Sequence, residues 1–399
     1  MTGIARINEP TTLERGGGKW LGLCRLHAEA AAVPKALCVE AHHFRELAQR
    51  LQLAEDADAL DAKEGQSIAP LSAALRARIQ RAGIPDPLRS AILTAIRELG
   101  AERVAVRSSA TAEDLADASF AGQYDSFLNL QGGSAVLDAV LACWASTFSD
   151  RAVASRQRLG IAHRDVAMAV VIQAMVAPEV SGVAFTHHPL EERPVLLVEA
   201  CTGLGEELVS GRLDPDRFEI DREGQHWRQL SGAAGTNLTE SRLFAMRDEF
   251  LRLEAQLGFP ADLEWSWCGD QLYLLQGRPI STSRPAATRP QPGGDEALQG
   301  TAASPGVAEG RARVLLEADQ VELDPGDVLV TTFTDPAWTR HFTRASALVM
   351  EHGGLLCHGA ILARECGIPA VVGVPRATSN IDDRRTIRVD GDAGEVRFP

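Results

Sequence analysis

A stretch that fits neither a helix nor a strand divides this sequence into two unequal parts. Residues 281–305 read STSRPAATRPQPGGDEALQGTAASP and contain four prolines and a Gly-Gly pair. Their length and proline content favour a linker over the alternative, which is a surface loop inside one domain. The sequence therefore predicts a domain of residues 1–284, a flexible linker at 285–303 and a second domain of residues 304–399.

The two predicted domains carry different patterns of apolar residues. In the first domain, apolar residues recur at three- and four-residue spacing and β-branched runs follow them. Helices are expected there at 44–53, 71–81, 88–99 and 136–148, and strands at 166–176, 195–199 and 271–276. In the second domain, strands are expected at 312–316, 327–332, 347–350, 370–374 and 386–389, with one helix at 359–366. The fold class is therefore predicted to be α/β (α+β).

Charge and apolar content exclude several classes of protein. The 40 Lys and Arg residues and 54 Asp and Glu residues give a formal net charge of −14, which argues against general binding to nucleic acid or to an anionic membrane. The longest apolar stretch, residues 166–180, is interrupted by Gln173 and Pro178 and is too short to span a bilayer. The N-terminus has no apolar leader and the seven cysteines are scattered, so we expect a cytoplasmic protein with reduced thiols.

Two glycine-rich segments lack the residues that the standard nucleotide-binding motifs need. In Gly16-Gly17-Gly18-Lys19, the next residue is Trp20, where a Walker phosphate loop has Ser or Thr. In Gly203-Leu204-Gly205, the position of the third glycine of a dinucleotide-binding fingerprint is Leu208, which breaks the motif. Neither segment predicts a nucleotide site by its own pattern.

Histidine and cysteine positions give little support for a transition-metal site. The adjacent pairs His42-His43 and His187-His188 are expected to lie on strands, where neighbouring side chains point to opposite faces. A zinc site in the second domain would need His352, Cys357, His358 and Cys366. That alternative is weak, because the neighbours at 357 and 358 rarely both reach one ion.

The strongest candidate for chemistry is His358, which the sequence places at the start of a helix. An apolar strand leads into Gly353-Gly354, and the helix is expected to end before Gly367, a residue suited to the left-handed C′ position. A neutral imidazole is a competent nucleophile, and a pKa of about 6.5 leaves it mostly neutral at cytoplasmic pH. The N–H groups at the helix start, with Arg364 as an added cation, would stabilise a phosphoryl group there. A polar helix cap is the alternative that spacing alone allows.

Residues 333–374 closely resemble the swivelling phosphohistidine domain of phosphoenolpyruvate synthase, pyruvate phosphate dikinase and rifampin phosphotransferase. The likeness lies in a TDPxW start, a GGxxCH core and an ARExGIPAVVG end, and it extends from about residue 304 to the C-terminus. In this family, the histidine that matches His358 accepts the phosphoryl group. The resemblance therefore implies a small β/β/α swivelling domain with His358 as its catalytic nucleophile.

The first domain contains a segment suited to a triphosphate. Arg107 ends a short apolar strand and is followed by Ser108-Ser109, Thr111 and a small-residue loop at 118–122. A cation beside hydroxyl groups and a compact loop suits phosphates, although a capped helix start with an exposed arginine fits this segment about as well. The order of these residues along the chain is similar to that in the ATP-grasp nucleotide domain of the same dikinases. The resemblance thus implies a two-lobed ATP-grasp fold for the first domain, with Arg107 as a catalytic and nucleotide-binding residue.

Two strand-like segments are candidates for a metal site. Asp262 and Glu264 alternate along one segment, and Gln276 and Arg278 along the next, so each pair shares a face of its strand. Carboxylate and amide oxygens suit Mg²⁺ on phosphates, although such pairs alone are usually solvated strand faces. In the family, the matching DxEW and LQxRP segments supply the metal ligands and a phosphate-binding arginine. The resemblance therefore implies Mg²⁺ ligands at Glu264, Gln276 and Asp262, and a catalytic, ATP-binding role for Arg278.

The resemblance assigns the remaining nucleotide contacts. Lys19 matches the N-terminal phosphate lysine of the family, with a catalytic and ATP-binding role. Gln173 and Met175 in VIQAMV, and Glu199 in VEA, match the stretch that lines the adenine and ribose. The cofactors implied are ATP and Mg²⁺.

The residues that bind the phosphoryl acceptor in the resembling enzymes have no counterpart in this sequence. The pyruvate-type enzymes carry a large barrel after the phosphohistidine domain, and the rifampin-type enzymes carry an acceptor domain between the two domains. This chain has only a linker between them and stops at Pro399.

We expect a dikinase-type phosphotransferase in which ATP phosphorylates His358 with release of AMP and phosphate. The acceptor is expected to be a small molecule or a separate acceptor protein. A phosphocarrier module is the alternative, and an inactive remnant is disfavoured because the aligned catalytic positions are intact.

Overall fold

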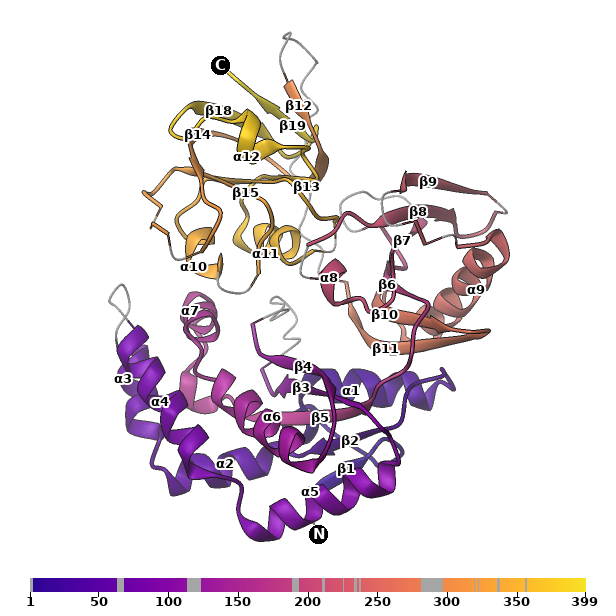
Figure 1. The fold of residues 1–399 in the computed structure, drawn as a ribbon, viewed down its shortest axis with the longest axis vertical. Coiled ribbons are helices and arrows are strands. Elements are labelled where there is room, and N and C mark those ends of the chain that lie inside the picture. The colour runs from indigo at the N-terminus through magenta and orange to yellow at the C-terminus, as the bar shows by residue number, and fades with distance from the viewer. Residues whose placement is uncertain are drawn as a thin grey trace. The chain divides into compact units, whose positions relative to one another are not determined.

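The computed structural model describes residues 3–62, 68–112, 123–188, 194–209, 212–224, 226–232, 235–236, 238–280, 297–318, 320–321, 323–335, 338–355 and 357–399. The chain forms two compact units (Figure 1). The first unit contains residues 1–177 and 270–278, and the second contains residues 178–269 and 279–399. No helix in the described part of the chain is long and apolar enough to cross a membrane.

The first unit is built on an antiparallel sheet of five strands in the order β1-β2-β5-β3-β4. The strands are β1 (Ile4–Arg6), β2 (Ala36–Val39), β3 (Val104–Ala110), β4 (Ser126–Leu130) and β5 (Met168–Ala174). The central strand β5 reads MAVVIQA, and its first six residues are buried. An unbroken apolar run of this kind is typical of a strand that is covered on both faces.

Helices cover this sheet and close its core. They are α1 (Leu13–Ala28), α2 (Ala41–Arg50), α3 (Ala54–Asp61), α4 (Ala69–Ala82), α5 (Asp86–Leu99), α6 (Gly133–Ser146) and α7 (Asp150–Leu159), with a 3₁₀ turn, η1 (His163–Asp165). One buried cluster joins helices and sheet, and it includes Trp20, Trp144 and Val170. Strand β11 (Gln271–Pro279) returns to this unit, where the backbone N–H of Leu274 donates to the carbonyl of Ala32 at 2.8 Å.

The second unit begins with an antiparallel sheet whose strands run in the order β10-β6-β7-β8-β9. The strands are β6 (Val180–Phe185), β7 (Val195–Thr202), β8 (Asp216–Asp221), β9 (Trp227–Gly232) and β10 (Ala261–Cys268), and the helices are α8 (Glu206–Val209) and α9 (Glu240–Leu257). Helix α9 begins after Thr239, whose hydroxyl accepts the N–H of Arg242, and ends at Gly258 in the left-handed conformation. These are ordinary start and stop signals for a helix.

The rest of the second unit is an eight-stranded mixed sheet in the order β12-β19-β18-β14-β15-β16-β17-β13. Its strands are β12 (Ala297–Gln299), β13 (Thr301–Ser304), β14 (Val307–Val314), β15 (Val328–Thr331), β16 (Ala347–Met350), β17 (Ala370–Val372), β18 (Thr386–Asp390) and β19 (Glu395–Arg397). Strands β14 to β17 run parallel to one another, and three helices accompany them: α10 (Thr339–Phe342), α11 (His358–Cys366) and α12 (Ala377–Asn380). Residues 297–397 of the second unit thus form one mixed sheet with short helices.

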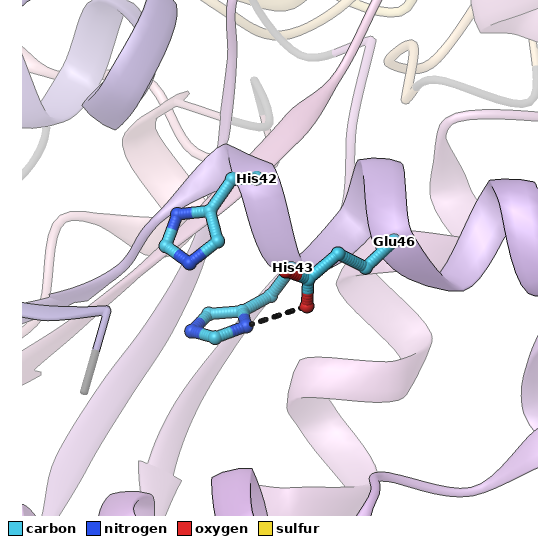
Figure 2. Close-up of side chains that lie close together, drawn as sticks. All are labelled: His42, His43 and Glu46. Atoms are coloured by element: carbon cyan, nitrogen blue, oxygen red, sulfur yellow. Dashed lines mark ion pairs between the residues drawn. The ribbon is translucent and has the colours of Figure 1, made fainter. Parts of the chain in front are cut away.

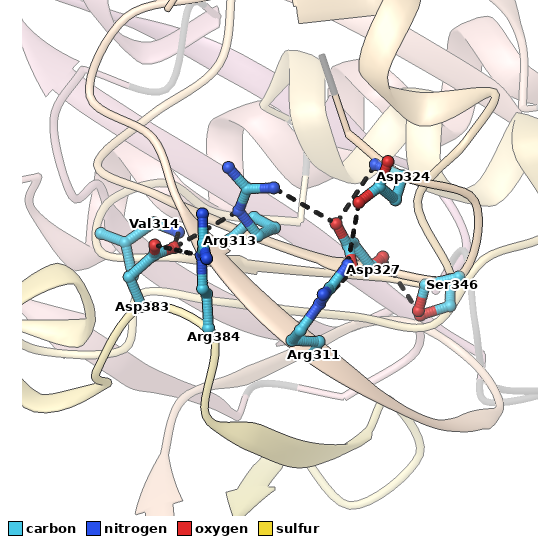
Figure 3. Close-up of polar contacts among 9 residues, drawn as sticks. Arg311, Arg313, Val314, Asp324, Asp327, Ser346, Asp383 and Arg384 are labelled. Atoms are coloured by element: carbon cyan, nitrogen blue, oxygen red, sulfur yellow. Dashed lines mark hydrogen bonds and ion pairs between the residues drawn. The ribbon is translucent and has the colours of Figure 1, made fainter. Parts of the chain in front are cut away.

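A charged network ties β14 to the turn that precedes β15 (Figure 3). The buried Asp327 accepts from Arg311 Nε at 3.2 Å and from Arg311 Nη2 at 3.1 Å, and Arg313 Nη1 lies 3.6 Å from its second oxygen. Arg311 also donates to Asp324 at 2.9 Å, and Arg313 Nε lies 3.5 Å from Asp383. Because Asp327 is buried and meets two guanidinium groups, this network fixes one end of the parallel strands.

The α/β class predicted from the sequence is confirmed. The four predicted helices of the first domain correspond to α2, α4, α5 and α6, and the predicted helix of the second domain is α11. Five predicted strands of the second domain correspond to β14, β15, β16, β17 and β18. Boundaries differ by a few residues, most at β14, because the sequence pattern begins at Ala312 whereas pairing with β18 starts at Val307.

Two sequence predictions differ from the structure. The segment predicted as a linker at 285–303 ends in strands, because β12 pairs with β19 and β13 pairs with β17; residues 281–296 lie outside the described part of the chain. The two histidine pairs do not lie on strands. His42-His43 lie on α2, and His187-His188 follow the end of β6 at Phe185.

Candidate functional site

His358 is the first residue of α11, as the sequence predicts. The preceding residue, Cys357, is the extended N-cap, with φ −69° and ψ 159°, and the helix ends at Gly367 in the left-handed conformation. The His358 side chain is largely buried, with 6% of its surface exposed. A helix start offers backbone N–H groups and the positive end of the helix dipole, which stabilise an anion nearby. The position therefore suits a histidine that carries a phosphoryl group.

Thr334 contacts the imidazole of His358. Its Oγ1 lies 3.4 Å from Nδ1 of His358 and 3.7 Å from the sulfur of Met350, and the ring of Phe342 meets the imidazole edge-on, with centroids 6.4 Å apart. A partner on one ring nitrogen fixes the orientation of the ring and the roles of its two nitrogens. Thr334 is the first residue of the TDPxW segment that carries the family resemblance, but its place beside the imidazole does not follow from that pattern.

Arg364 holds the loop that leads into α11. Its Nη1 donates to the carbonyl of Ala303 at 2.8 Å, and its Nη2 donates to the carbonyl of Leu355 at 2.8 Å. Burial lowers the pKa of this guanidinium below its ordinary value. The sequence suggested Arg364 as a cation for the phosphoryl group on His358, whereas both hydrogen bonds in the structure go to backbone carbonyls. Its role here is to position the loop.

Glu199 also contacts the loop before His358. It is fully buried on β7, and its Oε1 accepts from Arg217 Nε at 3.0 Å and from the backbone N–H of Leu355 at 2.9 Å. A Cβ on Gly354 would overlap this carboxylate, so glycine permits the close approach. The adenosine-binding role assigned to Glu199 stays a prediction, and the contact with Leu355 is an additional one that no local sequence pattern indicates.

Asp214, which precedes β8, is a second acidic residue that contacts this loop. It accepts from the backbone N–H of Gly353 at 2.9 Å, and its other oxygen lies 3.2 Å from Nδ1 of His352.

The structure does not support the zinc alternative in the second domain. Burial raises the pKa of the Cys357 thiol to about 11, so it is a neutral thiol rather than a metal-binding thiolate. Among the residues that the structure describes, the four of the zinc alternative do not form a close group of ligand atoms.

Asp262 and Glu264 share one face of β10. Strand β10 pairs with β6 in an unshifted register, with Asp262 opposite Phe185 and Glu264 opposite Val183. The intervening Leu263 is fully buried on the opposite face, as the alternation of a strand requires. Asp262 is buried and Glu264 is half-buried. The predicted pairing of these carboxylates on one face is thus present, with oxygens that suit a hard divalent cation.

Lys19 lies on α1, against the end of β3. Gly17 interrupts the helix with φ 72° and ψ 177°, and a Cβ there would overlap the carbonyl of Ser109. The hydroxyl of Ser109 donates to the carbonyl of Gly16 at 2.7 Å, and the Lys19 ammonium donates to the carbonyl of Ser108 at 2.9 Å. The glycine run therefore serves as a close packing point between α1 and β3 and brings the Lys19 ammonium to the backbone of Ser108, the residue after Arg107.

The predicted residues of β5 and β11 lie in this same first unit. Gln173 on β5 donates to the carbonyl of Leu275 at 3.3 Å. A Cβ on Gly22 of α1 would overlap the carbonyl of Gly277 and would lie 3.3 Å from Nε2 of Gln276. Helix α1 therefore carries Lys19 at one point and meets Gln276 at another. The backbone N–H of Met175 donates to the carbonyl of Arg103 at 2.9 Å.

The predicted site residues are divided between the two units. Those of the first unit are Lys19, Arg107, Gln173, Met175, Gln276 and Arg278, and those of the second are Glu199, Asp262, Glu264 and His358. The predicted Mg²⁺ ligands are divided too, with the two carboxylates in the second unit and the amide of Gln276 in the first. The small-residue loop predicted at 118–122 lies outside the described residues.

Two family models match separate parts of the chain. Residues 13–233 match the model described as "Pyruvate phosphate dikinase, AMP/ATP-binding domain". Residues 323–394 match the model described as "PEP-utilising enzyme, mobile domain". Lys19, Arg107 and Glu199 lie within the first match, and His358 and Thr334 lie within the second.

Three curated relatives are similar along almost the whole chain. A probable phosphoenolpyruvate synthase of Archaeoglobus fulgidus is 36% identical and one of Methanothermobacter thermautotrophicus is 34% identical. The phosphoenolpyruvate synthase of Aeropyrum pernix is 32% identical. Each alignment covers 95% of this chain, but only 56%, 61% and 56% of the respective relatives. The chain therefore spans a little over half the length of these relatives.

Proposed function

Because the chain belongs to the phosphoenolpyruvate synthase and pyruvate phosphate dikinase family, we propose that it is an ATP-dependent phosphotransferase that carries the phosphoryl group on His358. The observation that carries this proposal is the imidazole at the start of α11 with Thr334 at its Nδ1. An Nδ1–H that donates to Thr334 leaves the lone pair on Nε2, which becomes the nucleophile. The helix start then stabilises the charge of the phosphoryl group.

The proposed first half-reaction follows dikinase chemistry. Nε2 of His358 attacks the β-phosphorus of ATP and forms an N–P bond. The bond between this phosphorus and the oxygen that bridges it to the α-phosphorus breaks, and AMP leaves with the electron pair on that oxygen. Hydrolysis of the pyrophosphoryl-histidine then releases phosphate and leaves phosphohistidine. Three cations of the first unit, Lys19, Arg107 and Arg278, supply positive charge for the oxygens of the transferring phosphate.

The remaining assignments concern adenosine and the metal. Gln173, Met175 and Glu199 are proposed to line the adenosine. The oxygens of Asp262, Glu264 and Gln276 form a donor set suited to Mg²⁺, which would neutralise charge on the phosphates when bound. None of the seven cysteines forms a disulfide, which supports a place for this reaction in the reducing cytoplasm.

The proposed acceptor is a small molecule of unidentified structure. A separate acceptor protein is the second candidate, because the curated relatives contain sequence beyond the region that this chain matches. Multiple turnovers with a metabolite alone would identify a self-contained enzyme. Phosphate that leaves His358 only when a partner protein is added would identify a carrier.

Mass spectrometry after incubation with Mg-ATP tests the role of His358. We expect base-stable, acid-labile phosphate on His358, complete loss of it in His358→Ala, and unchanged labelling in His226→Ala, which removes an exposed histidine of the same unit. ATP binding should persist in His358→Ala, because the cations assigned to phosphate lie in the other unit. Undiminished labelling of His358→Ala would refute the assignment.

A further inference from the structure

Three side chains with metal-ligating atoms come together on α2, outside the site described above (Figure 2). His42, His43 and Glu46 are separated by one, three and four positions. On a helix, positions three and four apart lie on the same flank. The prediction that these histidines lie on a strand and diverge is wrong, because α2 begins at Ala41 and the two imidazole centroids lie 4.0 Å apart.

The distances among these side chains suit one small cation. One ligand atom from each of the three residues lies within 4.8 Å of the others. Nδ1 of His43 lies 3.5 Å from Oε2 of Glu46, and the two imidazole centroids are 4.0 Å apart. A tetrahedral ion with bonds of about 2.1 Å places its ligands about 3.4 Å from one another. The His43 and Glu46 atoms are thus already at this spacing. Within the described residues, no other group of three or more His, Cys, Asp and Glu side chains brings its ligand atoms this close together.

A buried carboxylate provides an independent sign of a built site. Oε2 of Glu40, the N-cap residue of α2, lies 3.4 Å from Nδ1 of His42, and its Oε1 pairs with Arg15 at 2.6 Å. The Glu40 side chain is only 7% exposed. A carboxylate on one nitrogen of a metal-ligating histidine orients the ring and raises the basicity of the other nitrogen. Glu40 therefore leaves Nε2 of His42 as the ligand atom.

Gly3 leaves room for both rings. A Cβ on this residue would overlap Nε2 of His43 and would lie 2.7 Å from Nε2 of His42. Its φ of +64° also favours glycine. Any other residue at this position would displace both rings, so the absence of a side chain at residue 3 is part of the arrangement.

From this geometry we infer that His42, His43 and Glu46 bind one divalent transition-metal ion of the Zn²⁺ class, with Glu40 as the residue that orients His42. Two imidazoles and one carboxylate are typical ligands of Zn²⁺, Ni²⁺ and Cu²⁺, whereas Mg²⁺ prefers oxygen ligands alone. Three protein ligands leave a fourth position for water or another donor. This site is separate from the proposed Mg²⁺ site and does not depend on the proposed function.

Calorimetric titration of the full chain with Zn²⁺, in excess Mg²⁺, tests this inference. Mg²⁺ occupies the oxygen-only sites and competes poorly for imidazole. We expect one equivalent of Zn²⁺ to bind, with an affinity reduced by about 100-fold or more in His42→Ala and His43→Ala. The loss should be about 10- to 100-fold in Glu40→Gln, the size found for carboxylates that orient a ligating histidine.

The matched control is His27→Ala, which removes an exposed histidine of α1 in the same unit and should bind Zn²⁺ as the native chain does. A second readout is thermal unfolding, since an ion that binds only the folded state raises the melting temperature. Zn²⁺ should raise it for the native chain and for His27→Ala, but not for Glu46→Ala, a change at an exposed side chain that leaves the core intact. Equal Zn²⁺ binding by the native chain and by the double variant His42→Ala, His43→Ala would overturn the inference.

Discussion

The charged side chains of the proposed site differ between the two units. In the first unit, the Lys19 ammonium donates to the carbonyl of Ser108 where the glycine run of α1 packs against β3, and Arg107 precedes Ser108 on that strand. In the second unit, the acidic residues Glu199 and Asp214 accept hydrogen bonds from the backbone of the loop that leads to His358. The first unit therefore contains the cations that are proposed to contact phosphate, whereas the second unit holds the loop before His358 with one buried carboxylate, Glu199, and one partly exposed carboxylate, Asp214.

This difference separates two kinds of effect that a substitution can have. A change among the cations of the first unit should alter the rate of phosphoryl transfer and leave the fold intact. A change among the carboxylates of the second unit should alter stability and loop placement first. Four substitutions test the two units separately, and they are expected to have successively smaller effects.

The largest effect is expected for Glu199→Gln. The change leaves the guanidinium of Arg217 without its buried carboxylate partner, and breaking such a pair from one side typically costs about 3 to 5 kcal/mol. Urea unfolding measures the loss. The matched control is Glu179→Gln, which breaks an exposed pair with Arg242 and should cost less than about 1 kcal/mol. Equal, small losses in both variants, with weakened ATP binding only in Glu199→Gln, would show that Glu199 serves the nucleotide and not the loop.

A rate effect is expected for Arg107→Ala. Removing one charged contact to a transferring phosphate commonly slows the chemical step by about 100-fold, or about 3 kcal/mol. Single-turnover formation of phosphohistidine measures the rate, and Arg103→Ala, a change at an exposed arginine just before β3, is the control. A rate within twofold of the native chain would remove Arg107 from the catalytic group, and a large loss of stability would contradict the division of tasks between the units.

The first unit should also show a pH-dependent stability that depends on His163. Burial, and then the charge of Arg156, lower the pKa of His163 to about 4, against the opposing effect of Asp61. The unfolded chain, with an ordinary histidine pKa of about 6.5, binds more protons between these values, so the free energy of unfolding falls as the pH drops from 6.5 to 4. Because each unit of difference between the folded and unfolded pKa corresponds to about 1.4 kcal/mol, the expected loss is about 3 kcal/mol. Unfolding measured at several pH values should show it in the native chain and not in His163→Gln; parallel curves for the two proteins would contradict this prediction.

The smallest effect is expected for Thr334→Val, which keeps the side-chain shape and removes the hydroxyl. Loss of one hydrogen bond of ordinary strength, about 1 kcal/mol, should slow phosphorylation of His358 by about fivefold. The pH dependence of the rate should shift as well, because Thr334 contacts Nδ1 of His358, and the partner of Nδ1 determines which ring nitrogen carries the proton. Thr343→Val, a change at an exposed threonine of the same unit, should match the native rate. An unchanged rate and pH profile in Thr334→Val would show that this hydroxyl does not position the histidine.

The parts of the site that the sequence predicted are those that depend on local spacing. His358 at a helix start follows from the Gly353-Gly354 turn and from Gly367 at the helix end. The shared face of Asp262 and Glu264 follows from alternation along one strand. Helices and strands with a clear apolar period were predicted within a few residues.

The parts that the sequence could not supply are contacts between distant residues. Leu355 and Glu199 are 156 positions apart, and Arg364 and Ala303 are 61 positions apart. Strands β12 and β13 form because β19 and β17 pair with them, although their own residues carry no strand pattern. For the histidine pair on α2, the visible apolar period starts at Phe44, and the helix extends three residues before it.

The nucleotide released during a single turnover shows whether the β- or the γ-phosphate of ATP is transferred to His358. The full chain is mixed with Mg-ATP, and AMP, ADP and phosphohistidine are quantified together. Attack of His358 on the β-phosphorus predicts one AMP for each phosphohistidine formed, and no AMP from His358→Ala. One ADP for each phosphohistidine would mean that the γ-phosphate is transferred, and it would contradict the dikinase mechanism proposed for this chain.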